Sequence, residues 1–102
     1  MERANNILFE DIKNFIREQT GVSTKRISKN SRLEKDLKIY GDDAFELINA
    51  YSKKFDVDVS EFEIADYFSP EGGTFLYRLI NPAKNSLTVS DLENGVIKGK
   101  LR

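Results

Sequence analysis

The sequence predicts a single all-α domain, and two observations support this prediction. Apolar residues recur at helical spacing in three segments, at about 8–19, 44–55 and 89–96. Residues that favour helix ends flank these segments, namely Gly21, Asp42 and the pair Thr88 and Asp91. A chain of 102 residues can bury a modest core as one compact domain, residues 1–102.

The first helix is expected within residues 7–22, with Gly21 as a left-handed cap. Its buried stripe should consist of Leu8, Ile12, Phe15, Ile16 and Gln19. From Val22 to Tyr40 the sequence is polar and lacks a helical period. Four apolar residues should hold this connection on the core: Val22, Ile27, Leu33 and Leu37.

The second helix should begin at the acids near Asp42 and end at about Phe55. Its buried face is predicted to hold Ala44, Leu47, Ile48, Tyr51 and Phe55. Ser60 and Glu63 form part of a capping box, which predicts a short third helix beginning there. That helix should pack Phe62, Ala65 or Tyr67, and Phe68.

Residues 69–86 read as an insertion before the final helix. Ser69-Pro70 predicts a second cap, the apolar cluster at 75–80 predicts a short helix, and Asn81-Pro82 ends it. Thr88 and Asp91 should begin the final helix, with Val89, Leu92 and Val96 buried and Gly99 at its end. Asn94-Gly95 leaves a β-hairpin open as the alternative.

Composition excludes several classes of function. The chain has no cysteine and no histidine, so it lacks disulfides, thiolate metal sites and the usual general base. Its net charge of −1 is too balanced for a nucleic-acid binder. No apolar run approaches the roughly 20 residues of a membrane span. The N-terminus lacks a signal peptide's pattern, so we expect a cytoplasmic protein without membrane insertion.

Residues 36–47, DLKIYGDDAFEL, resemble the prosthetic-group motif of acyl and peptidyl carrier proteins. In that motif a serine at the start of the second helix carries phosphopantetheine, within an Asp-Leu…Asp-Ser-Leu…Glu-Leu pattern. Asp36-Leu37 and Glu46-Leu47 match its ends, and Gly41 occupies the serine position. No serine lies between Ser31 and Ser52, so we expect no phosphopantetheine and no other cofactor.

The resemblance covers most of the chain and is closest to an uncharacterised bacterial branch of carrier-like proteins. It implies an acyl-carrier-protein-like helical bundle, with three main helices, short additional helices and a long loop between the first two main ones. The insertion at about 69–86 has no clear counterpart in ordinary carriers.

Four residues at the start of the second helix are the candidate site: Asp42, Asp43, Phe45 and Glu46. Carrier proteins dock on basic patches of their enzymes through acids on this helix, and the residue at Phe45 contacts the partner. The acids could instead only cap the helix and complement its dipole, and Phe45 could be buried against the insertion. Asp36, Asp42 and Asp43 lack the spacing of a calcium loop, so no metal site is predicted.

Five basic residues give the connection between the first two helices a positive character: Lys25, Arg26, Lys29, Arg32 and Lys35. A solvated loop that balances the acidic helix explains them. A docking surface for an acidic partner or a phosphate is the alternative.

The sequence therefore suggests a non-enzymatic interaction or adaptor module that docks, as a monomer, on a protein partner with a basic patch. Adjacent carboxylates at a solvated helix start give no reason for the separated pKa values of acid–base catalysis. Two alternatives remain open. The chain could be a genuine carrier with an atypical attachment, or a carrier-like binder of a free acyl chain.

Overall fold

The computed structural model describes residues 2–68 and 86–101, and side chains from residue 7 onward within these ranges. In this part of the chain the regular elements are helical, in agreement with the predicted all-α class. They are α1 (Glu2–Thr20), the 3-10 turn η1 (Thr24–Arg26), α2 (Gly41–Phe55), α3 (Ile64–Tyr67) and α5 (Val89–Lys98). None of the described helices is both long and apolar enough to cross a membrane.

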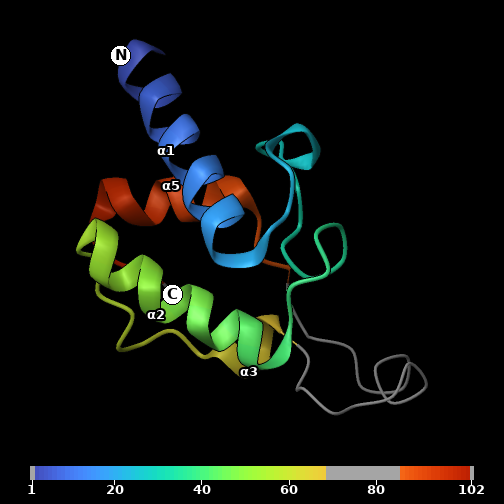
Figure 1. The fold of residues 1–102 in the computed structure, drawn as a ribbon. Coiled ribbons are helices and arrows are strands. Elements are labelled where there is room, and N and C mark those ends of the chain that lie inside the picture. Colours follow the sequence, from blue (N-terminus) through green and yellow to red (C-terminus); the bar gives the residue numbers. More distant parts are fainter. Residues whose placement is uncertain (1, 69–85, 102) are drawn as a thin grey trace.

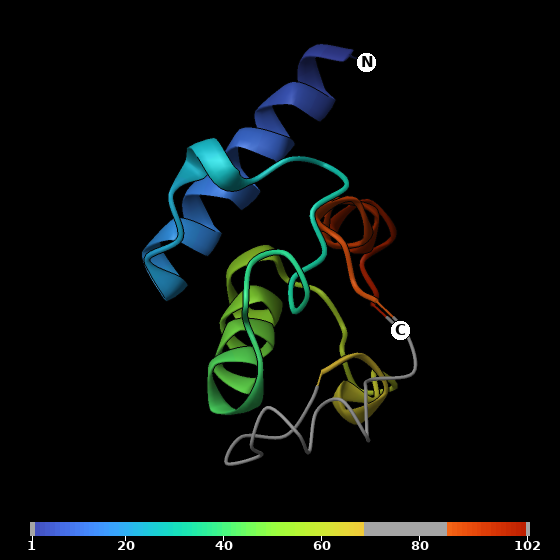
Figure 2. The ribbon, with the colours of Figure 1, turned by 90° about the vertical axis from the view of Figure 1, so that its right-hand side faces the viewer.

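Helix α1 packs against both α2 and α5, and its amino-terminal end projects from the rest of the described chain in both views (Figure 1, Figure 2). Ile12, Phe15 and Ile16 are buried as predicted. Gln19 is exposed, contrary to prediction, because its polar amide stays in water while Val22 beyond the turn packs against the core. The helix ends as predicted at Gly21, which has a φ of +80°.

Helix α2 buries Ala44, Leu47, Ile48 and Tyr51, as its apolar spacing predicts. Phe55 is only half-buried, and its ring meets that of Phe15 edge-on at 5.5 Å between centroids. This aromatic pair joins the last turn of α2 to the C-terminal half of α1. Asp56 then ends the helix in a left-handed conformation with a φ of +55°.

The long connection between α1 and α2 is held to the core along its length. Ile27, Leu33 and Leu37 are buried as predicted, and Val22 packs partly against the core. Backbone hydrogen bonds also tie this connection to the start of α5. The Leu33 N–H donates to the Leu87 carbonyl at 2.8 Å, and two further bonds of this kind follow: Val89 to Ser31 and Ser90 to Lys29.

The prediction of a helix beginning near Ser60 was wrong, because α3 starts only at Ile64. The Ser60 N–H instead donates to the side chain of Asp58 at 2.9 Å, which makes a local turn. Phe62 and Tyr67 stack at 4.9 Å between centroids. Phe68 is buried and Ala65 is exposed, so Tyr67 is the residue of the predicted pair that packs.

The segment that could have formed a hairpin is the helix α5. Its first turn carries a complete capping box: Thr88 N–H donates to Asp91 Oδ2 at 2.9 Å, and Asp91 N–H donates to Thr88 Oγ1 at 3.2 Å. Gly99 ends it with a φ of +77°. Val89 and Leu92 are buried as predicted, with Val96 partly buried.

The expected elements within the insertion lie outside the described residues. These are the Ser69-Pro70 cap, the short helix at 75–80 and its end at Asn81-Pro82.

Candidate functional site

The acidic start of α2, defined as Asp42, Asp43, Phe45 and Glu46, lies on the protein surface. All four residues are exposed, and 58% of the Phe45 surface is accessible to solvent. Asp42, Phe45 and Glu46 stand at i, i+3 and i+4, so they share one face of the helix. The structure therefore places Asp42, Phe45 and Glu46 on one exposed face of α2, whereas Asp43, two residues before Phe45, is exposed on another side of the same turn.

Asp42 and Asp43 do not occupy the N-cap position of α2, which the alternative interpretation of these acids as helix caps had assigned to them. Tyr40 is the N-cap residue of α2, and its side chain forms no capping hydrogen bond. Asp42 and Asp43 stand inside the first turn, where negative charge complements the helix dipole. Neither Asp43 nor Glu46 forms an ion pair with a residue in the described ranges.

Gly41, at the position of the carrier serine, has a left-handed backbone with a φ of +62°. A residue with a Cβ atom pays roughly 1–2 kcal/mol for this conformation. The backbone therefore favours glycine at this position. Lys38, three residues earlier, has the same φ of +62° although it carries a full side chain.

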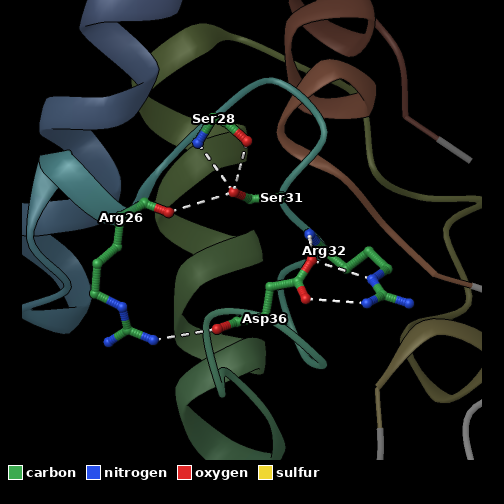
Figure 3. Close-up of polar contacts among 5 residues, drawn as sticks. All are labelled: Arg26, Ser28, Ser31, Arg32 and Asp36. Carbon is green, nitrogen blue, oxygen red and sulfur yellow. Dashed lines mark hydrogen bonds and ion pairs between the residues drawn. The ribbon is translucent and has the colours of Figure 1, made fainter.

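Asp36 organises the basic connection before α2 (Figure 3). Arg32 donates from Nε and Nη2 to the two carboxylate oxygens of Asp36, at 3.1 and 3.0 Å, and its backbone N–H donates to the same carboxylate at 2.8 Å. Arg26 donates to the Asp36 carbonyl at 3.2 Å. The hydrogen bonds from Arg32 lower the pKa of Asp36 to about 2.

A second polar cluster lies beside this pair in the same loop. Ser31 is buried, and its hydroxyl accepts from the Ser28 N–H at 2.9 Å and contacts the Ser28 hydroxyl at 3.1 Å. It also lies 3.4 Å from the Arg26 carbonyl, to which it donates (Figure 3). The loop thus satisfies its polar groups internally, which explains how a long connection can hold one conformation.

The five basic residues of the loop therefore do not form one uniform surface. Arg26 and Arg32 are bound to Asp36. Lys29 lies 3.7 Å from the buried carboxylate of Glu93 and 5.3 Å from the centre of the Phe9 ring. These contacts favour a structural role over a role in docking for three of the five residues, Arg26, Lys29 and Arg32.

Sequence reasoning missed these roles of Asp36, Ser31 and Glu93. A local pattern could have indicated the role of Asp36, since Arg32 and Asp36 carry opposite charges and stand four residues apart. Ser31 and Glu93 carry no such pattern. The loop geometry brings Ser31 to its partners, and Lys29, the partner of Glu93, lies in the loop, far from α5 in the sequence. In the described ranges, no group of three acids is arranged to hold a metal ion.

Comparison with known proteins places the chain in a family. No curated protein matches it. The family model described as "Protein of unknown function (DUF1493)" matches residues 5–99, which is nearly the whole chain. The chain therefore belongs to the DUF1493 family of proteins of unknown function.

Proposed function

We propose that this protein is a non-enzymatic interaction or adaptor module that docks on a basic patch of a protein partner through the acidic start of α2. We further propose that its bundle is acyl-carrier-protein-like and works without phosphopantetheine. The observation that carries the docking proposal is the exposure of Phe45 on the same helix face as Asp42 and Glu46. Aromatic residues are enriched in protein interfaces, so a phenylalanine that is 58% exposed beside these carboxylates supports a binding surface.

Electrostatics support a basic partner. Asp43 and Glu46 have no ion-pair partner in the described part of the chain, so their charges remain available to another molecule. Charges of this kind raise the association rate and restrict the orientation of the complex. Phe45, on the same helical turn, would supply apolar contact area once water is excluded.

The carrier-like architecture is supported by the order of the elements. A long first helix, a long ordered loop, a second helix with an acidic start, a short third helix and a final helix follow one another along the described chain. The left-handed Gly41 supports the absence of a tethered arm, because a serine would be strained at this position.

The docking surface can be tested by affinity capture with the immobilised full-length protein and quantitative mass spectrometry of the retained proteins. We expect one basic partner to be retained by the wild type and lost with the Asp43→Lys/Glu46→Lys variant. The control is Asp11→Lys/Glu63→Lys, which makes the same charge change at two exposed positions outside α2. Equal retention by the two folded variants would exclude the acidic start of α2 as the docking surface.

The contribution of Phe45 to docking is tested with a second pair of variants. Phe45→Ala should weaken capture of the same partner, whereas Ile97→Ala should not. Ile97 is a suitable control because it is also a large exposed apolar residue, 66% accessible, on another helix. If both variants capture the partner as the wild type does, Phe45 has no part in docking.

The absence of a tethered group can be tested separately. The purified protein is incubated with a phosphopantetheinyl transferase and coenzyme A, and its intact mass is measured. We expect no change in mass. A gain equal to one phosphopantetheine would show a genuine carrier and would overturn this part of the proposal.

A further inference from the structure

A cavity of about 520 Å³ lies beside α5, on a different part of the molecule from the proposed docking surface. This volume falls within the roughly 300–1,000 Å³ of small-molecule sites. On α5 the lining residues are Asp91, Asn94, Gly95 and Lys98, which follow one helical stripe. The other described lining residues are Tyr67, Ser86, Leu87, Lys100 and Leu101.

Three apolar or aromatic residues of this lining are held in place by their packing. Leu87 and Leu101 are both 4% exposed and belong to the hydrophobic core. The ring of Tyr67 is held by its stack on Phe62. Because Leu87 and Leu101 are almost fully buried, only their edges reach the cavity, and the partly buried Tyr67 ring adds to this apolar part of the lining.

The charged groups of the lining are not equivalent. The carboxylate of Asp91 accepts the Thr88 N–H in the capping box, and Lys100 Nζ lies 3.3 Å from a carboxylate oxygen of Glu61. Lys98, in the last turn of α5, has no ion-pair partner in the described ranges. Among the described residues, the Lys98 ammonium group of the lining is thus left without a paired carboxylate.

We propose that this cavity binds a small organic anion, with its carboxylate or phosphate group at Lys98 and its apolar part against the Tyr67 ring and the exposed edges of Leu87 and Leu101. Hydrogen bonds between an ammonium and an anionic oxygen are among the stronger ones in proteins. Asn94 and Ser86 can each donate a further hydrogen bond to such a ligand. This inference is independent of docking at α2, so either proposal can fail alone.

The test is a titration of the ¹⁵N-labelled full-length protein, followed by amide chemical shifts. The probes are phenyl phosphate and octanoate, which join an anion to an apolar body, and inorganic phosphate, which lacks that body. We expect saturable shifts at the amides of the lining residues with phenyl phosphate or octanoate, and the better probe identifies the anionic group. Inorganic phosphate should bind about tenfold more weakly, since it buries no apolar surface.

A pair of lysine variants tests the role assigned to Lys98. Lys98→Met should lower the affinity for the better probe about tenfold, because it removes a charge-assisted hydrogen bond. Lys53→Met is the control, since Lys53 is exposed in the last turn of another helix, α2. The proposal is overturned if neither organic anion gives saturable shifts at the lining, if neutral 1-octanol binds as tightly as octanoate, or if the two variants bind alike.

Discussion

The hydroxyl group of Tyr51 occupies the space that a Cβ atom at Gly95 would need. The same hydroxyl donates to the carbonyl of Leu92 at 2.7 Å, and the Tyr51 side chain is fully buried between α2 and α5. A methyl group of Leu101 would lie 3.3 Å from that Cβ. Glycine stands inside α5 because only a residue without a side chain leaves room for the Tyr51 hydroxyl against the backbone of this helix.

Gly95→Ala should therefore destabilise the protein, although alanine is the better helix former by about 1 kcal/mol. Overpacking against the Tyr51 hydroxyl should lower the free energy of unfolding by roughly 1–3 kcal/mol. Urea denaturation measures this change. Asn94→Ala, on an exposed position of the same helix, should stay within about 0.5 kcal/mol of the wild type. A stabilised Gly95→Ala variant would contradict the close approach.

The effects of Tyr51→Phe and Gly95→Ala on the free energy of unfolding should not be additive. Alone, Tyr51→Phe leaves the buried Leu92 carbonyl without its donor and should cost about 1–3 kcal/mol. It also removes the atom that collides with a Cβ at position 95, so Gly95→Ala should cost less in the Tyr51→Phe background. A double-mutant cycle by urea denaturation should show a coupling of at least about 0.5 kcal/mol. Additive effects would mean that the hydroxyl is not the obstacle.

Asp36 should make stability depend on pH in the acid range. Its pKa of about 2 in the folded protein lies below the ordinary value of 3.8, so the unfolded chain binds more protons between these values. The stability that Asp36 contributes is therefore present above about pH 4 and is lost as the pH falls toward 2. The advantage of the wild type over Asp36→Asn should shrink over this range in urea denaturation.

The cause of this pKa can be checked by carboxyl ¹³C NMR. In Arg32→Met the carboxylate of Asp36 loses its bidentate partner, so its pKa should rise toward 3.8. An unchanged titration midpoint in Arg32→Met would show that the guanidinium does not set the pKa.

Gly41 and Lys38 have the same left-handed φ, but exchanging glycine for a side chain and a side chain for glycine at these positions should affect stability to different extents. Gly41→Ala should lower the free energy of unfolding by roughly 1–2 kcal/mol, because it adds a Cβ to a left-handed backbone. Lys38→Gly should stay within about 0.5 kcal/mol of the wild type, since relief of strain offsets the added freedom of the unfolded chain. Thermal unfolding of both variants measures the difference, and a neutral Gly41→Ala would contradict this backbone preference.

The main helices could be predicted because their information is local. Apolar spacing and helix-end residues located α1, α2 and α5, and Thr88 with Asp91 marked the start of α5 correctly. The choice between helix and hairpin at Asn94-Gly95 stayed open because both patterns fit the dipeptide. The contact of Gly95 with Tyr51 accounts for the glycine, and no local pattern contains that contact.

The surface at α2 was predictable for the same reason, since its residues are neighbours in the sequence. Ile39, by contrast, is buried without having been identified, and Glu93 is buried beside Lys29. Both depend on how the loop lies over the bundle. Loop geometry follows from contacts distant in sequence, which apolar spacing does not record.

The backbone hydrogen bonds between the loop and residues 87–90 join positions more than half the chain apart. The loop therefore forms these hydrogen bonds only when the start of α5 is packed against it. Closing so long a stretch of chain carries an entropic cost. These two regions should consequently gain and lose protection from hydrogen exchange together, as one cooperative unit. A fragment that stops after α2 would keep the sequence of the loop and lack the partners that give it shape.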